Sequence, residues 1–169
     1  YWFYLSTKGE AFNDEAKDAI SGEATGVTAT DLYDGDVYEN IAAKVIKNKT
    51  YLFDGNGHML TGVLKLEGDA YRSGGSDLED GGIYYFSEED GSENGQMLTG
   101  KQTYDNEGED ETYYFKKNGQ AYTNALVSGA IYDSEGKRVD AEDGAAYMLY
   151  TTEADITDDD GTTVLIPEG

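Results

Sequence analysis

The chain has 169 residues, enough for one domain or a short repeat array and too few for two sizeable independent cores. Its formal charge of −23 at pH 7 opposes binding to nucleic acid, anionic lipid or anionic wall polymers. The absence of Cys excludes disulfides and sulfur-ligated zinc, and no apolar run approaches the ~20 residues that cross a bilayer, so no membrane insertion is expected. Neutral glycans, cationic groups, divalent metals and basic protein patches remain as partners.

Leu, Ile, Val and Phe together make up only 30 residues, which in so acidic a chain is typical of disorder. Two features favour an ordered chain instead. The 15 Tyr bury large areas while keeping a hydroxyl for water, and the apolar residues occur in short alternating runs. The chain begins at Tyr1 rather than Met, so we expect a processed or excised piece of a longer protein.

The first predicted segment, residues 1–43, is a degenerate repeat followed by an irregular stretch. Its "FYLSTKGEAF" is a loose copy of a phrase that recurs later, whereas residues 13–43 match that phrase poorly. Within this part, "DEAKDA" favours a short helix, and "DVYENIAAKVI" is compatible with a helix or a strand.

The second predicted segment, residues 44–139, is an array of repeated phrases. They read "YLFDGNGHMLTG" from Tyr51, "YYFSEEDGSENGQMLTG" from Tyr84 and "YYFKKNGQAYTN" from Tyr113, with a shorter echo at 131–139. Each predicts a β-hairpin, because an aromatic strand, a polar turn and a return strand follow one another. Gly55 and Gly57 are predicted to supply the positive φ of the first turn.

Further turns at Lys47-Asn48 and Ser128-Gly129 link the hairpins end to end. A lone hairpin is marginal in water, so each unit must bury its aromatic face against the next. The predicted fold class is therefore all-β, a solenoid of stacked β-hairpin repeats with irregular acidic loop insertions. Acidic, Gly-rich insertions such as "EGDAYRSGGSDLEDGG" and "YDNEGEDE" are placed in exposed loops.

The aromatic strands also predict which side chains are buried and which face a ligand. Alternate residues of a strand share a face, so the first and third aromatic position of each phrase are predicted to form the scaffold. These scaffold residues are Tyr51, Phe53, Tyr84, Phe86, Tyr113 and Phe115. The candidates for contact with a glycan are Tyr85, Tyr114, Tyr104 and Tyr122. The alternative is that these four only form cross-strand pairs over a thin sheet.

The third predicted segment, residues 140–169, contains two strands around an Asp-rich turn and forms a C-terminal hairpin or cap. Calcium is a candidate metal here and near the N-terminus, since hard oxygen ligands in Gly-containing turns suit this ion. The candidate ligands are Asp31, Asp34 and Asp36 in "DLYDGD", and Asp158 and Asp160 in "ITDDDGT". Neither stretch fits the twelve-residue calcium loop, and solvated acidic loops are the alternative. No cofactor is required.

No catalytic site is predicted, and the chain is not expected to be an enzyme. His58 is the sole imidazole, lies beside a turn Gly and has no nucleophile motif, which favours a surface residue next to the turn. With 35 Asp and Glu, carboxylate pairs are guaranteed by abundance and do not indicate glycosidase chemistry.

The repeated phrase consists of an aromatic strand, a turn, the letters "NG" and the letters "TG". It resembles the choline-binding or glucan-binding cell-wall repeat of Gram-positive surface proteins, wall hydrolases, glucosyltransferases and toxins. The resemblance covers about residues 44–139. It implies a spiral of β-hairpins that attaches non-covalently to choline-decorated wall polymers or to carbohydrate. In choline-binding members, Trp residues after the "TG" and before the aromatic strand box a quaternary ammonium.

Those Trp positions are filled differently in this chain. Val63, Lys101 and Ala125 follow the three copies, and the only Trp of the sequence is Trp2. The familiar choline cage is therefore not expected, and Lys101 places a cation where a cationic ligand would sit.

The sequence thus predicts a non-catalytic module that attaches a larger protein to a neutral glycan or cell-surface polymer. Its expected location is extracellular, secreted or associated with the cell wall. The alternatives are a structural stalk or adhesin segment with a protein partner, and the repeat tail of a secreted enzyme or toxin.

Overall fold

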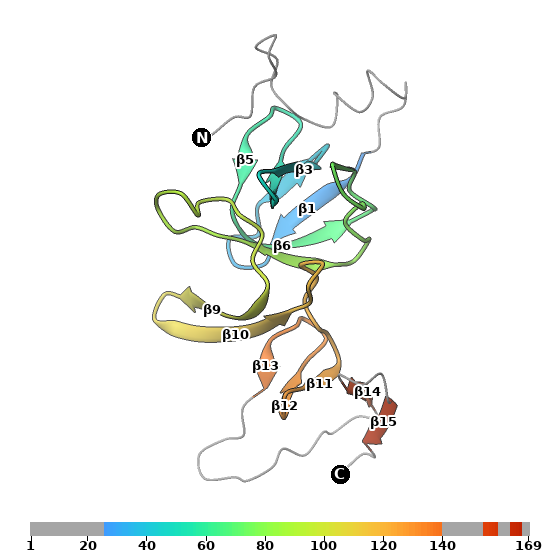
Figure 1. The fold of residues 1–169 in the computed structure, drawn as a ribbon. Helices are drawn as coiled ribbons and strands as arrows, with labels where there is room; N and C mark the ends of the chain where they lie inside the picture. Colours follow the sequence, from blue (N-terminus) through green and yellow to red (C-terminus); the bar gives the residue numbers. More distant parts are fainter. Residues whose placement is uncertain (1–25, 140–153, 159–162, 167–169) are drawn as a thin grey trace. The chain divides into compact units, whose positions relative to one another are not determined.

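The computed structural model describes residues 26–139 together with two C-terminal strands, 154–158 and 163–166 (Figure 1). The chain divides into two compact units, Tyr1–Leu98 and Thr99–Gly169. The described residues form strands, turns and bridges without a helix, which confirms the all-β prediction. None of them therefore lies in a helix long and apolar enough to span a membrane. The predicted repeat copy at Phe3–Phe12 and the helix in "DEAKDA" lie outside the described residues.

The first unit contains two four-stranded sheets. One has the order β2-β1-β6-β8 and is antiparallel throughout; its strands are Val37–Glu39, Thr28–Asp31, Gly62–Glu67 and Ile83–Phe86. The other has the order β5-β4-β3-β7, with strands Met59–Leu60, Lys49–Phe53, Ala42–Ile46 and Arg72–Ser73. The ambiguous stretch "DVYENIAAKVI" thus forms the strands β2 and β3 rather than a helix.

Both sheets of the first unit bury their side chains in one shared core. Ala29 of β1, Leu64 of β6 and Phe86 of β8 belong to it, as do Ala43 of β3 and Leu52 of β4. All five are fully buried. In this unit the hairpins therefore pack around a common centre, and the predicted solenoid of end-to-end hairpins is not confirmed.

The predicted turns fall where the sequence places them, with one exception. Lys47 and Asn48 have φ of 49° and 63°, and Ser128 and Gly129 have φ of 50° and 78°, as tight hairpin turns require. Gly57 also has a positive φ, of 81°.

The prediction for Gly55 is wrong, since its φ is not positive. Glycine is required there by close packing: a Cβ would lie 2.9 Å from the Cβ of Asn40 and 3.2 Å from the carbonyl oxygen of Glu39. The Gly55 N–H donates a hydrogen bond of 2.9 Å to that same carbonyl.

The scaffold prediction is confirmed for the second and third phrases and wrong in part for the first. Phe53 is buried, and so are both scaffold residues of each later phrase, namely Tyr84, Phe86, Tyr113 and Phe115. Tyr51, however, is half-buried, whereas its neighbour Leu52 is fully buried. Strand β4 lies between β3 and β5, and Leu52 is in register with Ala43 and Leu60, so all three side chains reach the shared core.

The insertion "EGDAYRSGGSDLEDGG" is not an exposed loop. Ala70 and Leu78 are fully buried in the shared core and exchange two backbone hydrogen bonds, of 2.9 and 2.8 Å. The carboxylates of Asp69 and Asp80 accept hydrogen bonds from backbone N–H groups of the same segment. Acidic side chains therefore fix this segment locally while its two apolar residues anchor it to the core.

The second unit begins with the hairpin of β9 (Gly100–Asn106) and β10 (Glu109–Phe115). Its turn is formed by Glu107 and Gly108, both of positive φ, so "YDNEGEDE" forms strand ends and a turn rather than the expected loop.

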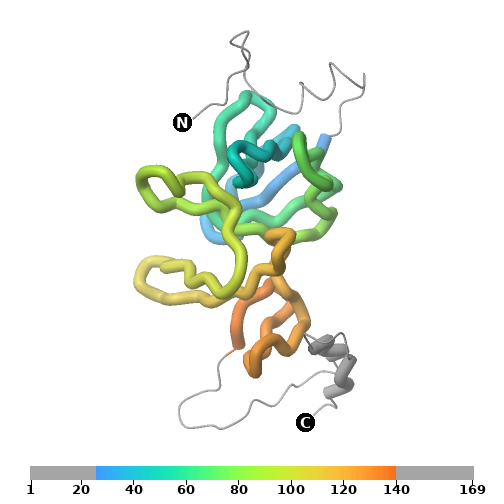
Figure 2. The backbone as a smooth tube through the Cα atoms, viewed as in Figure 1, coloured from blue at the N-terminus to red at the C-terminus, as the bar shows by residue number. Residues whose placement is uncertain are grey.

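A five-stranded sheet follows in the order β13-β12-β11-β14-β15, and Figure 2 traces the backbone of both units. Its strands are Arg138–Val139, Ala130–Tyr132, Ala125–Val127, Ala154–Asp158 and Thr163–Ile166. Strands β14 and β15 pair in antiparallel register, as predicted for the C-terminal hairpin. The predicted boundaries at 43/44 and 139/140 stay predictions.

Candidate functional site

The second unit contains a hollow of about 320 Å³ at the end of strand β10, which we call the aromatic pocket. Its lining residues are Thr99, Gly100, Tyr114, Phe115, Lys116, Lys117 and Tyr122. All belong to the β9–β10 hairpin, the residue before it, or the turn and return strand of the third repeated phrase.

The third phrase builds this pocket through a tight turn after β10. The Lys116 N–H donates to the carbonyl of Gln120 at 2.8 Å, and the Gly119 N–H donates back to the carbonyl of Lys116 at 2.9 Å. Beyond the turn, the Tyr122 N–H donates to the carbonyl of Tyr114 at 2.9 Å. The backbone thus brings two tyrosines, eight positions apart in the sequence, next to each other.

The rings around the pocket divide into a buried pair and an accessible pair. Tyr113 and Phe115 are buried and stacked, with ring centroids 5.7 Å apart. Tyr114 and Tyr122 are half-buried and meet edge to face at 5.9 Å, and Tyr114 also meets the buried Tyr132 at 6.3 Å. These contacts hold the Tyr114 and Tyr122 rings in place, which reduces the entropy that a ligand must remove on binding.

The charge at the pocket is positive. The Lys116 ammonium lies 5.3 Å from the centroid of the Tyr122 ring and donates a hydrogen bond of 3.0 Å to the Gln120 side chain. Lys117 is exposed beside it, and no Asp or Glu is among the lining residues that the structure describes. One face of the Tyr122 ring is thus already in contact with the protein's own cation.

The four predicted glycan-contact tyrosines lie in different places. The structure brings Tyr114 and Tyr122 together in the aromatic pocket. Tyr104 lies further along the same hairpin, opposite Glu111, and does not line the pocket. Tyr85 is on β8 in the first unit, half-buried; burial raises the pKa of its hydroxyl, and the charges of Glu88 and Glu89 raise it further.

Lys116 and Lys117 were missed by the sequence reasoning, which treated them as ordinary turn residues. A signal was present: two consecutive lysines directly follow an aromatic strand in a chain with only 12 Lys and Arg. Their position in a pocket depends on the turn that folds them back toward Tyr122.

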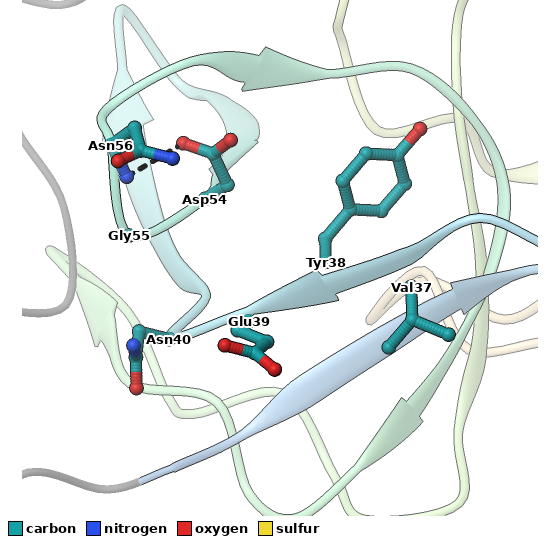
Figure 3. A pocket seen from close by; sticks show the side chains of 7 residues that line it. All are labelled: Val37, Tyr38, Glu39, Asn40, Asp54, Gly55 and Asn56. Carbon is teal, nitrogen blue, oxygen red and sulfur yellow. Dashed lines mark hydrogen bonds between the residues drawn. The ribbon is translucent and has the colours of Figure 1, made fainter.

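A second hollow, of about 350 Å³, lies in the first unit and is mostly polar (Figure 3). Its lining residues are Val37, Tyr38, Glu39, Asn40, Asp54, Gly55 and Asn56. The Asp54 carboxylate accepts hydrogen bonds of 2.8 Å from the backbone N–H groups of both Asn56 and His58. This acidic side chain is therefore largely committed to its own turn.

His58 is not simply a surface residue. It is half-buried, and its Nδ1 lies 3.1 Å from Asp54 Oδ2 in addition to the backbone hydrogen bond. The side chain was expected to be incidental because the sequence does not show that the turn folds Asp54 against it. The contact gives His58 a structural role in the turn.

The acidic stretch around Asp31 is a hydrogen-bonded turn. Asp31 is only 6% exposed, and its Oδ1 accepts hydrogen bonds from the N–H groups of Tyr33 and Asp34, at 2.8 and 3.0 Å. Nearby, partial removal from water raises the pKa of the Glu88 carboxyl, and the charges of Asp31 and Asp34 raise it further.

The calcium prediction stays a prediction. Within residues 26–139, no three His, Asp or Glu side chains are grouped so that they could hold a metal ion, and this includes Asp31, Asp34 and Asp36. The side chain of Asp158 and all of Asp160 lie outside the described residues.

Comparison with known proteins gives similarity to solved structures alone, since no protein-family model and no curated protein matches the chain. CbpJ from Streptococcus pneumoniae TIGR4 is 23% identical over 82% of this chain and 38% of its own, with a TM-score of 0.41. Choline binding protein F from Streptococcus pneumoniae is 24% identical over 82% and 44%, with a TM-score of 0.30. A truncated alternansucrase from Leuconostoc mesenteroides is 17% identical over 89% and 11%, with a TM-score of 0.40.

One of these structures is a choline binding protein, the kind of protein that the repeated phrase resembles. The chain spans less than half the length of each of the three. The residues of the aromatic pocket therefore indicate the function more directly than these similarities do.

Proposed function

We propose that this chain is a non-catalytic carbohydrate-binding module and that the aromatic pocket is its sugar site. The observation that carries the proposal is the pairing of Tyr114 and Tyr122 at a hollow of about 320 Å³. Binding sites for small molecules start at about 300 Å³ and combine apolar walls with a few polar groups. Here the ring surfaces meet the C–H face of a sugar, and Lys116, Lys117 and Thr99 supply hydrogen bonds to its hydroxyls.

A choline site is a weaker candidate for the same pocket. The residues 26–139 contain no Trp, and the Tyr122 ring is in contact with the Lys116 ammonium. A quaternary ammonium would meet a like charge there instead of an open aromatic cage.

The proposal includes an extracellular or wall-associated setting for the module. A module built from phrases similar to wall-binding repeats suits attachment of a larger extracellular or wall-associated protein to a glycan or cell-surface polymer. The stalk with a protein partner and the repeat tail of an enzyme or toxin remain the alternatives.

The test is calorimetric titration of the chain with a panel of short oligosaccharides. We expect saturable binding that Tyr114→Ala and Tyr122→Ala each weaken by about tenfold, equal to about 1.4 kcal/mol. Tyr104→Ala is the matched control, because it removes the same ring from the same hairpin outside the pocket, and it should bind like the parent. Melting curves of all three variants show whether they remain folded. If no oligosaccharide of the panel binds, the alternative of a structural stalk with a protein partner is favoured.

A further inference from the structure

The two lysines of the aromatic pocket have no acidic partner among the described residues. The chain has 35 Asp and Glu against 12 Lys and Arg, so carboxylates outnumber basic side chains about three to one. Lys137 in the same unit is paired with two of them, with its Nζ 2.9 Å from Glu111 and 3.8 Å from Glu135. Within residues 26–139, by contrast, neither Lys116 nor Lys117 makes an ion pair. Their positive charges are thus left at a hollow without a carboxylate in its lining.

A third lysine adds to this positive charge. Lys101 on β9 is exposed and directly opposite Tyr114 on β10. Residues directly opposite each other in an antiparallel pair project from the same face, with Cβ atoms about 5 Å apart. Lys101 therefore extends from the face of the hairpin that carries Tyr114.

The acidic character of the whole chain does not cancel this local charge. Charges separated by more than about 8 Å are largely screened at physiological ionic strength, so groups at the pocket dominate the potential there. Between residues 99 and 139 the sequence holds 5 basic and 7 acidic residues, a formal charge of −2, and three of the five bases are Lys101, Lys116 and Lys117. The prediction of a neutral glycan came from the net charge, which does not describe this part of the surface.

We propose that the aromatic pocket binds a sugar that carries an anionic group, a carboxylate or a phosphate, in preference to a neutral sugar or a quaternary ammonium. This inference rests on the proposed function and specifies its ligand class. The sugar ring lies against Tyr114 and Tyr122, and its anionic group accepts charge-assisted hydrogen bonds from Lys116 and Lys117, which are stronger than those of a neutral hydroxyl. The hydrogen bond from Lys116 to Gln120 holds that ammonium at the pocket before the ligand arrives.

In the experiment, the full chain is titrated with three tetrasaccharides, built of glucose, of glucuronic acid or of glucose 6-phosphate. The three sugars differ only in the group at carbon 6, which is a hydroxymethyl, a carboxylate or a phosphorylated hydroxymethyl group. A choline salt is the fourth probe. We expect at least one anionic tetrasaccharide to bind about tenfold more tightly than the neutral one at low salt, with the ratio falling toward one as NaCl is added. The two anionic probes distinguish carboxylate from phosphate recognition.

Lysine variants test whether the pocket is responsible. Lys116→Met and Lys117→Met should each remove most of the preference for the anionic probe while keeping most of the length of the side chain. Lys49→Met is the matched control, because it removes one positive charge from an exposed position in the first unit and should leave the preference intact.

The outcomes separate the two proposals. Equal or tighter binding of the neutral tetrasaccharide, still weakened by Tyr114→Ala, would overturn the anionic ligand and leave carbohydrate binding in place. The anionic ligand would also be overturned if Lys49→Met reduced the preference for the anionic probe as much as Lys116→Met does. The preference would then come from the overall charge of the chain and not from the aromatic pocket. Binding of choline alone, or no binding of any sugar, would overturn both.

Discussion

The two units use similar phrases to different ends. In the first unit the phrase from Tyr51 places its middle residue, Leu52, in a core that two sheets share. In the second unit the phrase from Tyr113 leaves its middle residue, Tyr114, half-buried at the wall of a hollow. The repeated phrase thus specifies a strand, a turn and a return strand, whereas the surrounding strands decide whether its middle residue supports the fold or faces a ligand.

Charge separates the two units as well. Residues 26–98 hold 5 basic and 14 acidic residues, a formal charge of −9, against −2 for residues 99–139. Several acids of the first unit accept backbone hydrogen bonds, among them Asp31, Asp54 and Asp80. Part of the acidity of the first unit thus lies in its turns, while in the second unit Lys116 and Lys117 make no ion pair with any other described residue.

The largest effect on stability is expected at the middle residue of the phrase from Tyr51, Leu52, compared with the middle residue of the phrase from Tyr113, Tyr114. Leu52→Ala should lower the free energy of unfolding by about 2–5 kcal/mol, because it leaves a cavity in a filled core. Tyr114→Ala should cost less, about 1–2 kcal/mol, because the ring is half-buried, and should instead weaken sugar binding. Urea unfolding of both variants measures the difference. Equal losses would contradict the assignment of Leu52 to the core and Tyr114 to the pocket.

The next effect concerns the acidic turn of the first unit. Asp31→Ala should lower the free energy of unfolding by about 1–3 kcal/mol, because it leaves the N–H groups of Tyr33 and Asp34 without their acceptor. Asp31→Asn keeps an oxygen at the same position and should cost clearly less. Thermal melts of the pair give the comparison, and an equal cost would mean that the charge, rather than the acceptor, holds the turn.

A smaller effect depends on pH and involves Glu88. Since its pKa is raised in the folded state, the folded chain binds this proton more tightly than the unfolded chain does. The resulting stability is present below the ordinary value of 4.5 and is lost as pH rises through the folded pKa. Glu88→Gln should therefore raise the melting temperature at pH 7 and change it little at pH 4. The gain is small because the side chain is exposed and screened.

The control for this prediction is Glu89→Gln, which removes the same charge one residue further along. If Glu88→Gln and Glu89→Gln raise the melting temperature at pH 7 by the same amount, the cause is a general effect of net charge. A gain for Glu88→Gln that is the same at pH 4 and pH 7 would contradict the linkage to its pKa.

The smallest expected effect tests the calcium prediction from the sequence. If Asp158 and Asp160, or the stretch from Asp31 to Asp36, bind calcium, the melting temperature should rise with calcium concentration relative to a chelator, since a ligand that binds only the folded state stabilises it. Magnesium at the same concentration controls for general screening of the negative charge. An unchanged midpoint would dismiss the calcium site.

The local features of the fold can be predicted from the amino-acid sequence alone. Period-two aromatic runs gave the all-β class, and the turns at Lys47-Asn48 and Ser128-Gly129 followed from residue types that tolerate positive φ. Tyr114 and Tyr122 could be named as candidates because both belong to one phrase whose strand and turn lie within a few residues of each other.

Features that depend on contacts between distant segments could not be predicted from the sequence. The burial of Leu52 in place of Tyr51 depends on the second sheet of the first unit, and the burial of Ala70 and Leu78 within an acidic insertion depends on the same core. Period-two alternation identifies the two faces of a strand but not which of them is covered, because the covering strands come from elsewhere in the chain. For the same reason, two lysines expected in a turn became the walls of a pocket only where that turn folds back on Tyr122.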